Sequence, residues 1–225
     1  MVVKPLSETD RNSGPTRIPL NRERVLRGAI LLADEGGIDS LSMRKLGQEL
    51  GVEAMSLYNH VANKDDILDG IVDAIQSEVE LVSGDGDWKA AIRRSALSAH
   101  EVLLRHPWAC RLSLSRPMVG PAKLRYVDSL IGSLRGAGFS IQLAHEAMHA
   151  IEGHVFGFTL QEVSFPSNIE DMGPQVAAIL LGRQMLDEYP NLSEVVLASI
   201  HDDQAEFEFV LDLILDGLER ARDSA

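Results

Sequence analysis

The sequence has one cysteine, no long apolar stretch and no apolar segment near its start, and each shortage excludes a class of protein. A single thiol, Cys110, cannot close an intrachain disulfide, so we expect a reducing, cytoplasmic compartment. The longest uninterrupted apolar run, 176–181, is far shorter than the ~18 residues of a membrane span. Positions 1–20 carry five charged residues and no continuous apolar core of the kind that a secretory signal peptide needs. We therefore expect neither membrane insertion nor secretion.

The overall composition is that of an ordinary globular protein, with 45% hydrophobic and 24% charged residues among 225. The net charge of −13 is unevenly distributed. Residues 1–64 carry nine Lys or Arg against eight Asp or Glu, whereas residues 65–225 carry twelve against twenty-six. All the excess negative charge thus lies outside the first 64 residues. This asymmetry is typical of a protein whose N-terminal part contacts phosphate.

Helical periodicity dominates the chain and strand patterns are almost absent, which predicts an all-α fold. Residues 1–20 contain three prolines and predict a flexible arm. Gly84-Asp85-Gly86 interrupts the helical pattern and is predicted to be a domain boundary, and the connections over 164–173 and 189–202 are the least helical and could act as pocket lids. The expected helices are 21–35, 42–50, 54–60, 64–82, 87–105, 107–115, 119–136, 140–163, 173–188 and 203–222.

Two short amphipathic helices, 42–50 and 54–60, are joined across Gly51 in the pattern of a helix-turn-helix. Glycine at this position is expected to adopt the left-handed conformation that reverses the chain. The second helix would then offer its first side chains to the major groove of DNA, which admits an α-helix. Such a helix pair is also common in all-α proteins, and Tyr58 could be a core residue. The candidate DNA-binding residues are Ser42, Met43, Arg44, Lys45, Ala54, Met55, Ser56, Tyr58, Asn59, His60 and Lys64.

The candidates divide by the chemistry of their side chains. Ser56 can donate to or accept from a base edge, and the apolar neighbours Ala54 and Met55 suit a thymine methyl group. Positioning on the phosphates is expected of Tyr58, His60 and Lys64, and Arg44 suits either a phosphate or a guanine. We expect the arm over 1–20 to precede a helix-turn-helix DNA-binding domain over 21–66 and a larger helical domain over 67–225.

The fuller string 20–71 resembles the N-terminal domain of the tetracycline-repressor (TetR) family. Three motifs carry the resemblance: Glu-Gly-Gly-Ile at 35–38, Leu-Ser-Met-Arg-Lys-Leu at 41–46 before Leu-Gly-Val, and Ser-Leu-Tyr-x-His at 56–60 followed by Asn-Lys. The resemblance implies a transcriptional repressor that binds a roughly palindromic operator as a homodimer and is released by a small ligand. Double-stranded operator DNA and a small-molecule effector are the partners it implies.

Residues 88–163 resemble the tetracycline repressors more weakly, in Trp88, Arg116-Pro117 and Gly138-Phe139-Ser140. In those repressors a histidine just before the Arg-Pro pair holds the drug-chelated magnesium. By the simplest alignment Leu112 takes that place here, and 64–82 contains no histidine. Glu162 matches an acidic residue near that metal but cannot rebuild the site alone. We therefore expect no metal site, no cofactor and an effector other than tetracycline.

The effector is expected to be a small hydrophobic molecule, because the candidate lining is mainly apolar with a few polar groups. Each candidate could equally be an ordinary core residue. The candidate effector-binding residues are His100, Leu104, Trp108, Arg111, Leu112, Met148, His154, Phe156 and Glu162.

His145-Glu146-Ala147-Met148-His149 matches the zinc-protease signature H-E-x-x-H, which makes a zinc hydrolase the alternative function. The spacing places both imidazoles on one helix face. A third ligand is missing, since His154 falls one residue short of the extended motif. The reading we favour is that His145, His149 and Glu152 face a partner helix or a pocket as hydrogen-bonded polar groups.

The last predicted helix, 203–222, is hydrophobic around most of its circumference, whereas a surface helix needs one apolar stripe. We expect one face to pack on its own subunit and the other on a neighbour. With the helix over 140–163, in which Gly153 and Gly157 permit close approach, it would form an isologous four-helix interface. The alternative is a fully internal helix.

Overall fold

The computed structural model describes residues 19–83, 86–116, 120–165, 179, 182, 187–198 and 202–224. Every regular element within these ranges is helical, so the expected all-α fold is confirmed. None of the helices described is long and apolar enough to cross a bilayer. The elements are α1 (Arg22–Gly36), η1 (Ile38–Ser40), α2 (Met43–Leu50), α3 (Ala54–Leu57), α4 (Lys64–Gln76), α5 (Trp88–Arg105), α6 (Pro107–Leu114), α7 (Pro121–Gly136), α8 (Ile141–Ser164), α11 (Pro190–Ala198) and α12 (Asp203–Asp223).

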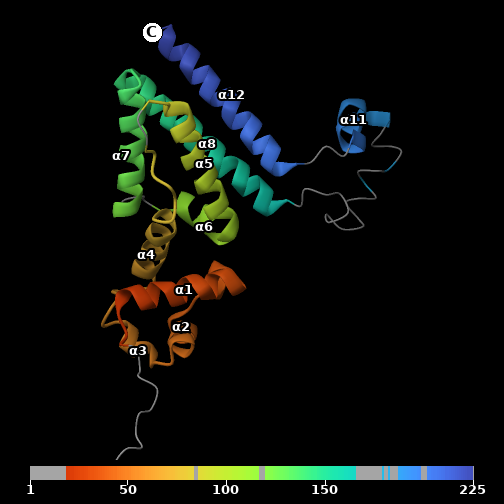
Figure 1. Ribbon diagram of the computed structural model, residues 1–225. Coiled ribbons are helices and arrows are strands. Elements are labelled where there is room, and N and C mark those ends of the chain that lie inside the picture. The colour runs from red at the N-terminus through yellow and green to blue at the C-terminus, as the bar shows by residue number, and fades with distance from the viewer. Residues whose placement is uncertain are drawn as a thin grey trace, which may run out of the picture.

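Helices α1, α2 and α3 lie together at one end of the molecule (Figure 1). Helix α4 packs on α1 and leads into a larger bundle made of α5, α6, α7, α8 and α12. The long helices α8 and α12 pack on each other and on α5. Helix α11 stands apart from this bundle in Figure 1. The small N-terminal module and the larger body are therefore joined mainly through α4.

Three helix starts follow from capping side chains. Asn21, Ser42 and Asn63 each accept a hydrogen bond from the backbone N–H three residues further on, at 2.8, 3.3 and 2.8 Å. Gly51 ends α2 with φ 67° and ψ 35°, which is the left-handed conformation expected of the turn. Local chemistry thus accounts for both ends of α2, the first helix of the helix-turn-helix.

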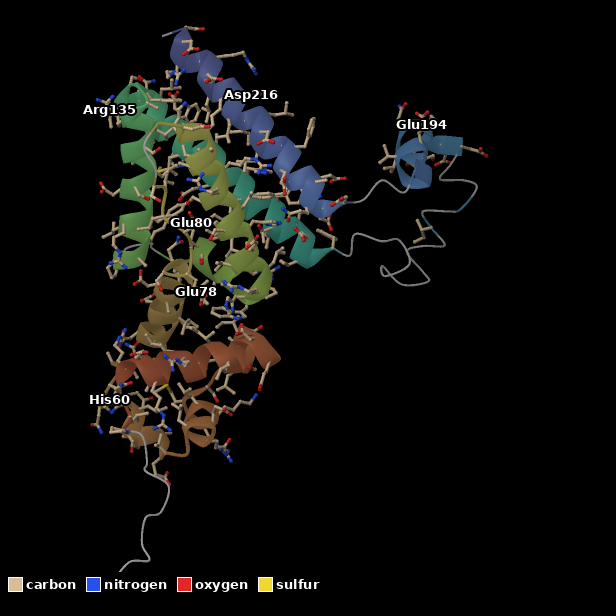
Figure 2. The ribbon with its side chains drawn as sticks, viewed as in Figure 1. His60, Glu78, Glu80, Arg135, Glu194 and Asp216 are labelled. Carbon is tan, nitrogen blue, oxygen red and sulfur yellow. The ribbon has the colours of Figure 1, made fainter. Side chains whose placement is uncertain are left out.

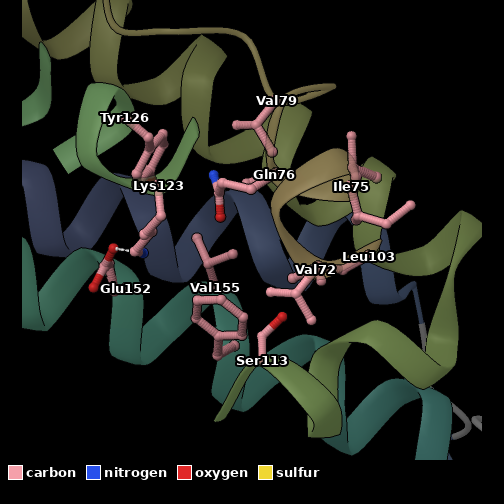
Figure 3. Close-up of a pocket in the computed structure, with 13 residues that line it drawn as sticks. Val72, Ile75, Gln76, Val79, Leu103, Ser113, Lys123, Tyr126, Glu152 and Val155 are labelled. Carbon is pink, nitrogen blue, oxygen red and sulfur yellow. Dashed lines mark hydrogen bonds and ion pairs between the residues drawn. The ribbon is translucent and has the colours of Figure 1, made fainter. Parts of the chain in front are cut away.

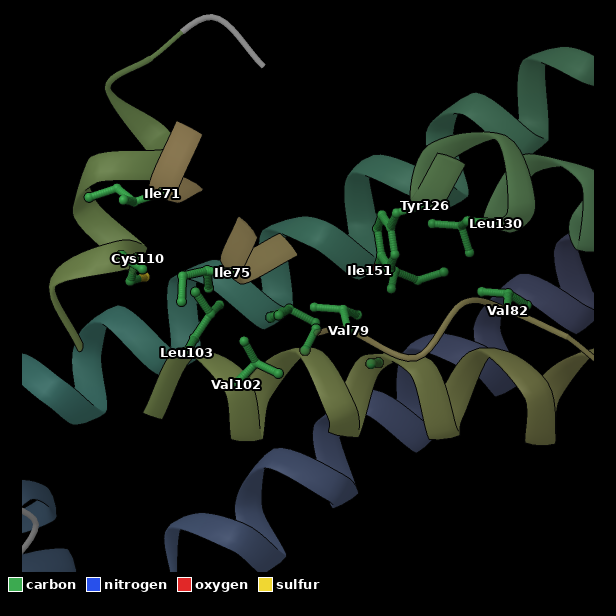
Figure 4. Packing of buried hydrophobic residues seen from close by; sticks show 14 of the residues in the cluster. Ile71, Ile75, Val79, Val82, Val102, Leu103, Cys110, Tyr126, Leu130 and Ile151 are labelled. Atoms are coloured by element: carbon green, nitrogen blue, oxygen red, sulfur yellow. The ribbon is translucent and has the colours of Figure 1, made fainter. Parts of the chain in front are cut away.

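A continuous apolar core runs from the N-terminal module into the body. Val25, Leu46, Leu57 and Ile67 are fully buried where α1, α2, α3 and α4 meet. Figure 4 shows the core continuing where Ile71, Ile75 and Val79 from the α4 region approach α5, α6 and α7; Val102, Leu103, Cys110 and Tyr126 supply the other side. Burial of apolar surface stabilises a fold by ~25 cal/mol per Å². Because α4 has buried side chains in both parts of the core, it is packed against the N-terminal module and against the body.

Two predicted helices are shorter in the structure. The third ends at Leu57 and continues as turns to His60. The fourth ends at Gln76 instead of residue 82, because the chain beyond it bonds to α5. The Glu80 backbone N–H donates to the Ser98 hydroxyl at 2.9 Å and its carbonyl accepts from the Ser95 hydroxyl at 2.6 Å. These bonds replace the helical ones.

The expectation that 189–202 is a non-helical lid is wrong, because Pro190–Ala198 forms α11. Pro190 begins this helix, where its missing N–H costs nothing. The predicted arm up to residue 18, and most of the predicted helix over 173–188 and of the lid over 164–173, lie outside the described residues.

Candidate functional site

The helix-turn-helix presents a polar surface at the free end of the molecule. Of the predicted DNA-binding residues, Ser42, Arg44, Lys45, Met55, Tyr58, Asn59 and Lys64 are exposed, while Met43, Ala54, Ser56 and His60 are half-buried. Figure 2 shows His60 at this end, far from Asp216 on α12. Met55 is 75% exposed and Tyr58 45%, so neither belongs to the core. The surface is therefore available to a large partner.

Two of these side chains also have structural roles. The Ser42 hydroxyl caps α2 by accepting from the Lys45 backbone N–H, and Met43 packs on the core. Gly47 sets the close approach of α2 to α3, since a Cβ there would lie 2.9 Å from the Val52 carbonyl oxygen. The relative angle of the two helices thus depends on backbone contact as well as on side chains.

Arg24 is a candidate contact that sequence reasoning missed. Its guanidinium donates to the Leu50 carbonyl oxygen at 3.1 Å, and the residue lines a hollow beside the turn together with Gly51 and Ser56. A basic residue in the first turn of the helix that precedes a helix-turn-helix is the signal that would have found it. The free N–H groups there already favour an anion.

Charged side chains connect the N-terminal module to the body. Asp34 on α1 accepts a hydrogen bond from the Trp108 indole N–H at 2.6 Å and lies 2.7 Å from Nδ1 of His106. Arg116, which follows α6, pairs with Asp65 and Asp69 on α4. A shift of α6 or α4 would therefore be transmitted to α1.

Helix α4 also contacts the start of α7. The Asp73 carboxylate accepts from the backbone N–H of Ala122 at 2.8 Å and of Lys123 at 3.4 Å. Gly120 has no room for a side chain, because a Cβ would lie 2.1 Å from this carboxylate. Asp73 thus acts as an N-terminal cap for α7 supplied by another helix.

A mainly apolar cavity lies between α4 and the body (Figure 3). Its free space is about 20 Å³, so side chains fill most of it. A bound organic molecule would have to displace some of them. The residues that line the cavity are Val72, Ile75, Gln76, Val79, Ala99, Val102, Leu103, Ser113, Lys123, Tyr126, Glu152, Val155 and Phe156.

The cavity contains a buried ion pair between Lys123 and Glu152. The Lys123 and Glu152 side chains are 7% and 14% exposed. The Lys123 ammonium also lies 5.0 Å from the ring centre of Tyr126 and 5.7 Å from that of Phe156, within cation–π range. Burial raises the pKa of the Tyr126 phenol, and the Glu152 charge raises it further, so this hydroxyl stays protonated. The cavity therefore offers one cation, one anion and aromatic faces to a bound molecule.

Of the nine predicted effector-binding residues, only Phe156 lines this cavity. Trp108 binds Asp34 at the junction with α1, and Arg111 is exposed. The other half-buried apolar candidates are Leu104, Leu112 and Met148. Sequence reasoning missed Lys123 and Tyr126 as candidates, because periodicity places them on α7 without showing which helix they face.

The remaining three candidates, His100, His154 and Glu162, form a separate polar cluster around Phe207 of α12. The His100 ring stacks on Phe207 at 4.0 Å between ring centres, and His154 Nε2 lies 2.9 Å from the Phe207 carbonyl oxygen. His100 Nε2 lies 3.4 Å from Glu162 Oε2, and neither atom has a hydrogen-bond partner. These residues link α5, α8 and α12.

Hydrogen bonding fixes the tautomer of His100. The Thr159 hydroxyl donates to the Val155 carbonyl oxygen at 2.6 Å, so it can only accept from His100 Nδ1–H, 2.8 Å away. Burial lowers the pKa of His100 to about 4, with a contribution from His154, and burial raises the pKa of Glu162. At neutral pH His100 is uncharged.

The H-E-x-x-H motif does not form a catalytic centre. His145 and His149 are exposed on α8, and the Glu146 carboxylate accepts from the Gln142 amide at 3.0 Å. Among the residues described, no three His, Cys, Asp or Glu side chains gather as a metal site. Glu152 faces the cavity, as expected, but the two histidines face outward.

The described features are those of a helix-turn-helix DNA-binding module joined to a helical ligand-binding body. Two family models match the chain, "Bacterial regulatory proteins, tetR family" over residues 25–71 and "Tetracyclin repressor-like, C-terminal domain" over residues 82–222. The chain therefore belongs to the TetR family. It is a TetR-family transcriptional repressor with a ligand-binding C-terminal domain, and regulators of this family are DNA-binding transcription factors rather than enzymes.

Similar proteins cover nearly the whole chain. It is 32% identical over 222 residues to the transcriptional repressor DrrR1 of Streptomyces coeruleorubidus, covering 93% of this chain and 82% of that protein. The crystal structure of ActR from Streptomyces coelicolor in complex with actinorhodin has a TM-score of 0.77 at 28% identity, covering 91% and 99%. The structure of BioQ with its double-stranded DNA operator has a TM-score of 0.63 at 26% identity, covering 89% and 98%.

Proposed function

We propose that this chain is a homodimeric repressor that binds a palindromic operator through the helix-turn-helix and is released by a small hydrophobic effector. The observation that carries the proposal is the exposed polar surface around the left-handed turn at Gly51. We assign the division of the chain accordingly: residues 21–66 bind DNA, and residues 67–225 dimerise and bind the effector. Its place of action is the cytoplasm, where bacterial DNA lies.

The DNA contacts divide into base readout and phosphate contacts. Ala54, Met55 and Ser56 begin α3 and would meet base edges in the major groove. Arg44, Lys45 and Lys64 are exposed cations around this helix and would bind phosphates, with Tyr58 and His60 positioning the module. BioQ, whose structure is similar to this chain, was solved with its double-stranded DNA operator, which supports DNA as the partner.

Dimerisation would use the outer faces of α8 and α12. Gly153 and Gly157 have open space where a side chain would lie, so another helix can approach α8 closely. On α12, Phe209 is 63% exposed and Leu213 51%, while Phe207 and Leu211 are buried against the body. Helix α12 thus has a second apolar face in addition to its core face, which a copy of the chain would cover by isologous contact.

The effector would bind in the cavity between α4 and the body. Its lining is mainly apolar, and Lys123 and Glu152 supply the polar anchors. Because the free space is small, binding has to move the lining, which includes Val72, Ile75 and Gln76 of α4. Helix α4 contacts α1 directly, so a ligand that moves α4 would change the preferred spacing of the two DNA-binding modules. A change of a few kcal/mol in the free-energy difference between the two spacings would release the operator.

The proposal is tested by selecting genomic DNA fragments that the purified protein retains and measuring binding by gel shift. Arg44→Ala and Tyr58→Ala should each weaken binding by about tenfold or more while the protein remains dimeric. Arg125→Ala, at an exposed position on α7, is the matched control and should leave affinity unchanged. Binding should also fall steeply with salt. Unchanged affinity in both variants would contradict the assigned surface.

A further inference from the structure

His145 and His149 on α8 are arranged to bind a metal ion that the proposed function does not use. They stand one helical turn apart, and their Nε2 atoms lie 3.3 Å from each other. Both side chains are exposed to solvent. Apart from this contact, no hydrogen bond ties either ring to another described residue. The two nitrogens therefore lie side by side on the exposed surface of α8.

The separation of these nitrogens matches a tetrahedral metal site. Zinc binds imidazole nitrogen at about 2.0–2.1 Å with tetrahedral geometry, which places two ligand atoms about 3.3–3.4 Å apart. A separation of 3.3 Å is that edge length. The ring planes are inclined at 85°, so the two rings can approach one ion from different sides without contact between their faces.

Hydrogen bonding between the rings is a weaker explanation of the arrangement. One neutral imidazole can donate to the other, but at 3.3 Å the contact is long, and an exposed bond of this kind adds little because water competes for both nitrogens. A metal ion uses both lone pairs at once and needs both rings neutral, with their protons on Nδ1.

We propose that His145 and His149 form a two-histidine site for a divalent transition-metal ion of the zinc class. Imidazole ligands favour Zn²⁺, Ni²⁺ or Cu²⁺ over Mg²⁺ and Ca²⁺, which prefer oxygen. No third ligand comes from the residues described, so water or a group from another molecule completes the coordination. Glu146, between the two histidines in sequence, accepts from the Gln142 amide and is not one of the proposed ligands.

The site lies beside the surface that the proposed dimer would cover. At 100° per residue, His149 is about 40° around α8 from Gly153 and His145 is about 80° from it, so the pair lies at the edge of that surface. Each dimer would then carry two separate ions, one on each copy of α8. An ion held across one helical turn also stabilises that turn, so α8 should unfold at higher temperature when the site is filled.

The test is a calorimetric titration of the full-length chain, without a histidine tag, with ZnCl₂. We expect one ion per chain, and His145→Ala and His149→Ala should each weaken binding by about tenfold or more, since each removes one of two protein ligands. Glu146→Gln should bind zinc as the wild type does. Cobalt should give the intense visible absorption of a tetrahedral complex.

A matched variant separates geometry from histidine content. His149→Ala combined with Ala150→His keeps the number of histidines but moves one ring 100° around α8, so it should bind zinc no better than His149→Ala alone. Absence of saturable binding by the wild type up to about 1 mM zinc would overturn the proposal. So would equal affinity in the wild type and both alanine variants, because the ion would then lie elsewhere.

Discussion

The Asp73 carboxylate on α4 accepts the backbone N–H of Ala122 at 2.8 Å and so caps α7 from another helix. The next residue, Lys123, pairs with Glu152 in the cavity. The start of α7 therefore contacts both the helix that leads to the DNA-binding module and the polar anchors of the proposed effector site. A ligand that moves Lys123 would disturb the cap that Asp73 of α4 supplies to α7.

Asp73→Ala should destabilise the protein by about 1 kcal/mol, the typical cost of losing a capping side chain. Asp73→Asn keeps an oxygen that can accept the same hydrogen bond, so it should retain most of the stability. Urea unfolding of the two variants measures the difference. If both variants unfold like the wild type, the cap carries no free energy.

Replacing one member of the buried ion pair should destabilise the protein far more than replacing both members. Lys123→Met leaves Glu152 buried without a partner and should lower the free energy of unfolding by about 3–5 kcal/mol. Adding Glu152→Met removes the second charge and should restore most of that loss, because apolar replacements of similar volume are tolerated there. Denaturant titrations of the single and double variants check this. A double variant less stable than the single one would contradict it.

Gly47→Ala should impair DNA binding through the angle between α2 and α3. The added Cβ would lie 2.9 Å from the Val52 carbonyl oxygen and 3.1 Å from the Ala54 backbone nitrogen, so backbone has to move. Overpacking of this kind costs about 1–3 kcal/mol, and operator affinity should fall with it. Gly132→Ala on α7 is the control, because its Cβ would meet open space and a helical alanine is favourable there.

Much of the N-terminal module was predictable from sequence because local chemistry determines it. Asn21, Ser42 and Asn63 cap helices through hydrogen bonds to residues three positions further on, which depend only on nearby sequence. Glycine at position 51 is the residue that adopts the left-handed turn at least cost. The end of the fourth helix was not predictable in this way. Hydrogen bonds between the Glu80 backbone and the hydroxyls of Ser95 and Ser98, on the next helix, accompany its end.

The cavity was less predictable, since its polar anchors come from different helices. Lys123 and Glu152 are 29 residues apart in sequence, and only tertiary packing brings them together. The periodicity of α8 did not show whether a histidine faces the core or solvent. His154 turned out to contact α12, whereas His145 and His149 face outward.

Dimerisation through α8 and α12 should depend on the exposed apolar residues of α12. Phe209→Glu combined with Leu213→Glu should convert the dimer into monomers and weaken operator binding by about 10²-fold, because the two half-sites are then bound separately. Leu124→Glu on α7, also at an exposed position, should remain dimeric. Sedimentation velocity gives the oligomeric state, and a dimeric double variant would contradict the proposed interface.

Stability should fall as the pH is lowered from about 6.5 to about 4. Burial lowers the pKa of His100 from 6.5 to about 4, so between these values the unfolded chain binds a proton that the folded chain does not. Above pH 6.5 His100 is neutral in both the folded and the unfolded chain, so it no longer makes the stability depend on pH. His100→Gln should show a smaller loss over the same range in urea titrations. An identical pH dependence in the variant would show that His100 is not responsible.

The most direct test of the account attaches an iron–EDTA group at position 55 and maps where it cleaves the operator. Burial raises the pKa of the Cys110 thiol to about 11, so a new cysteine in Met55→Cys, at a residue 75% exposed, is labelled selectively. Two symmetric groups of cuts are expected, one for each subunit, with centres about 34–36 Å apart. Cleavage from a label at Leu124→Cys but not from position 55, or a single group of cuts, would contradict it.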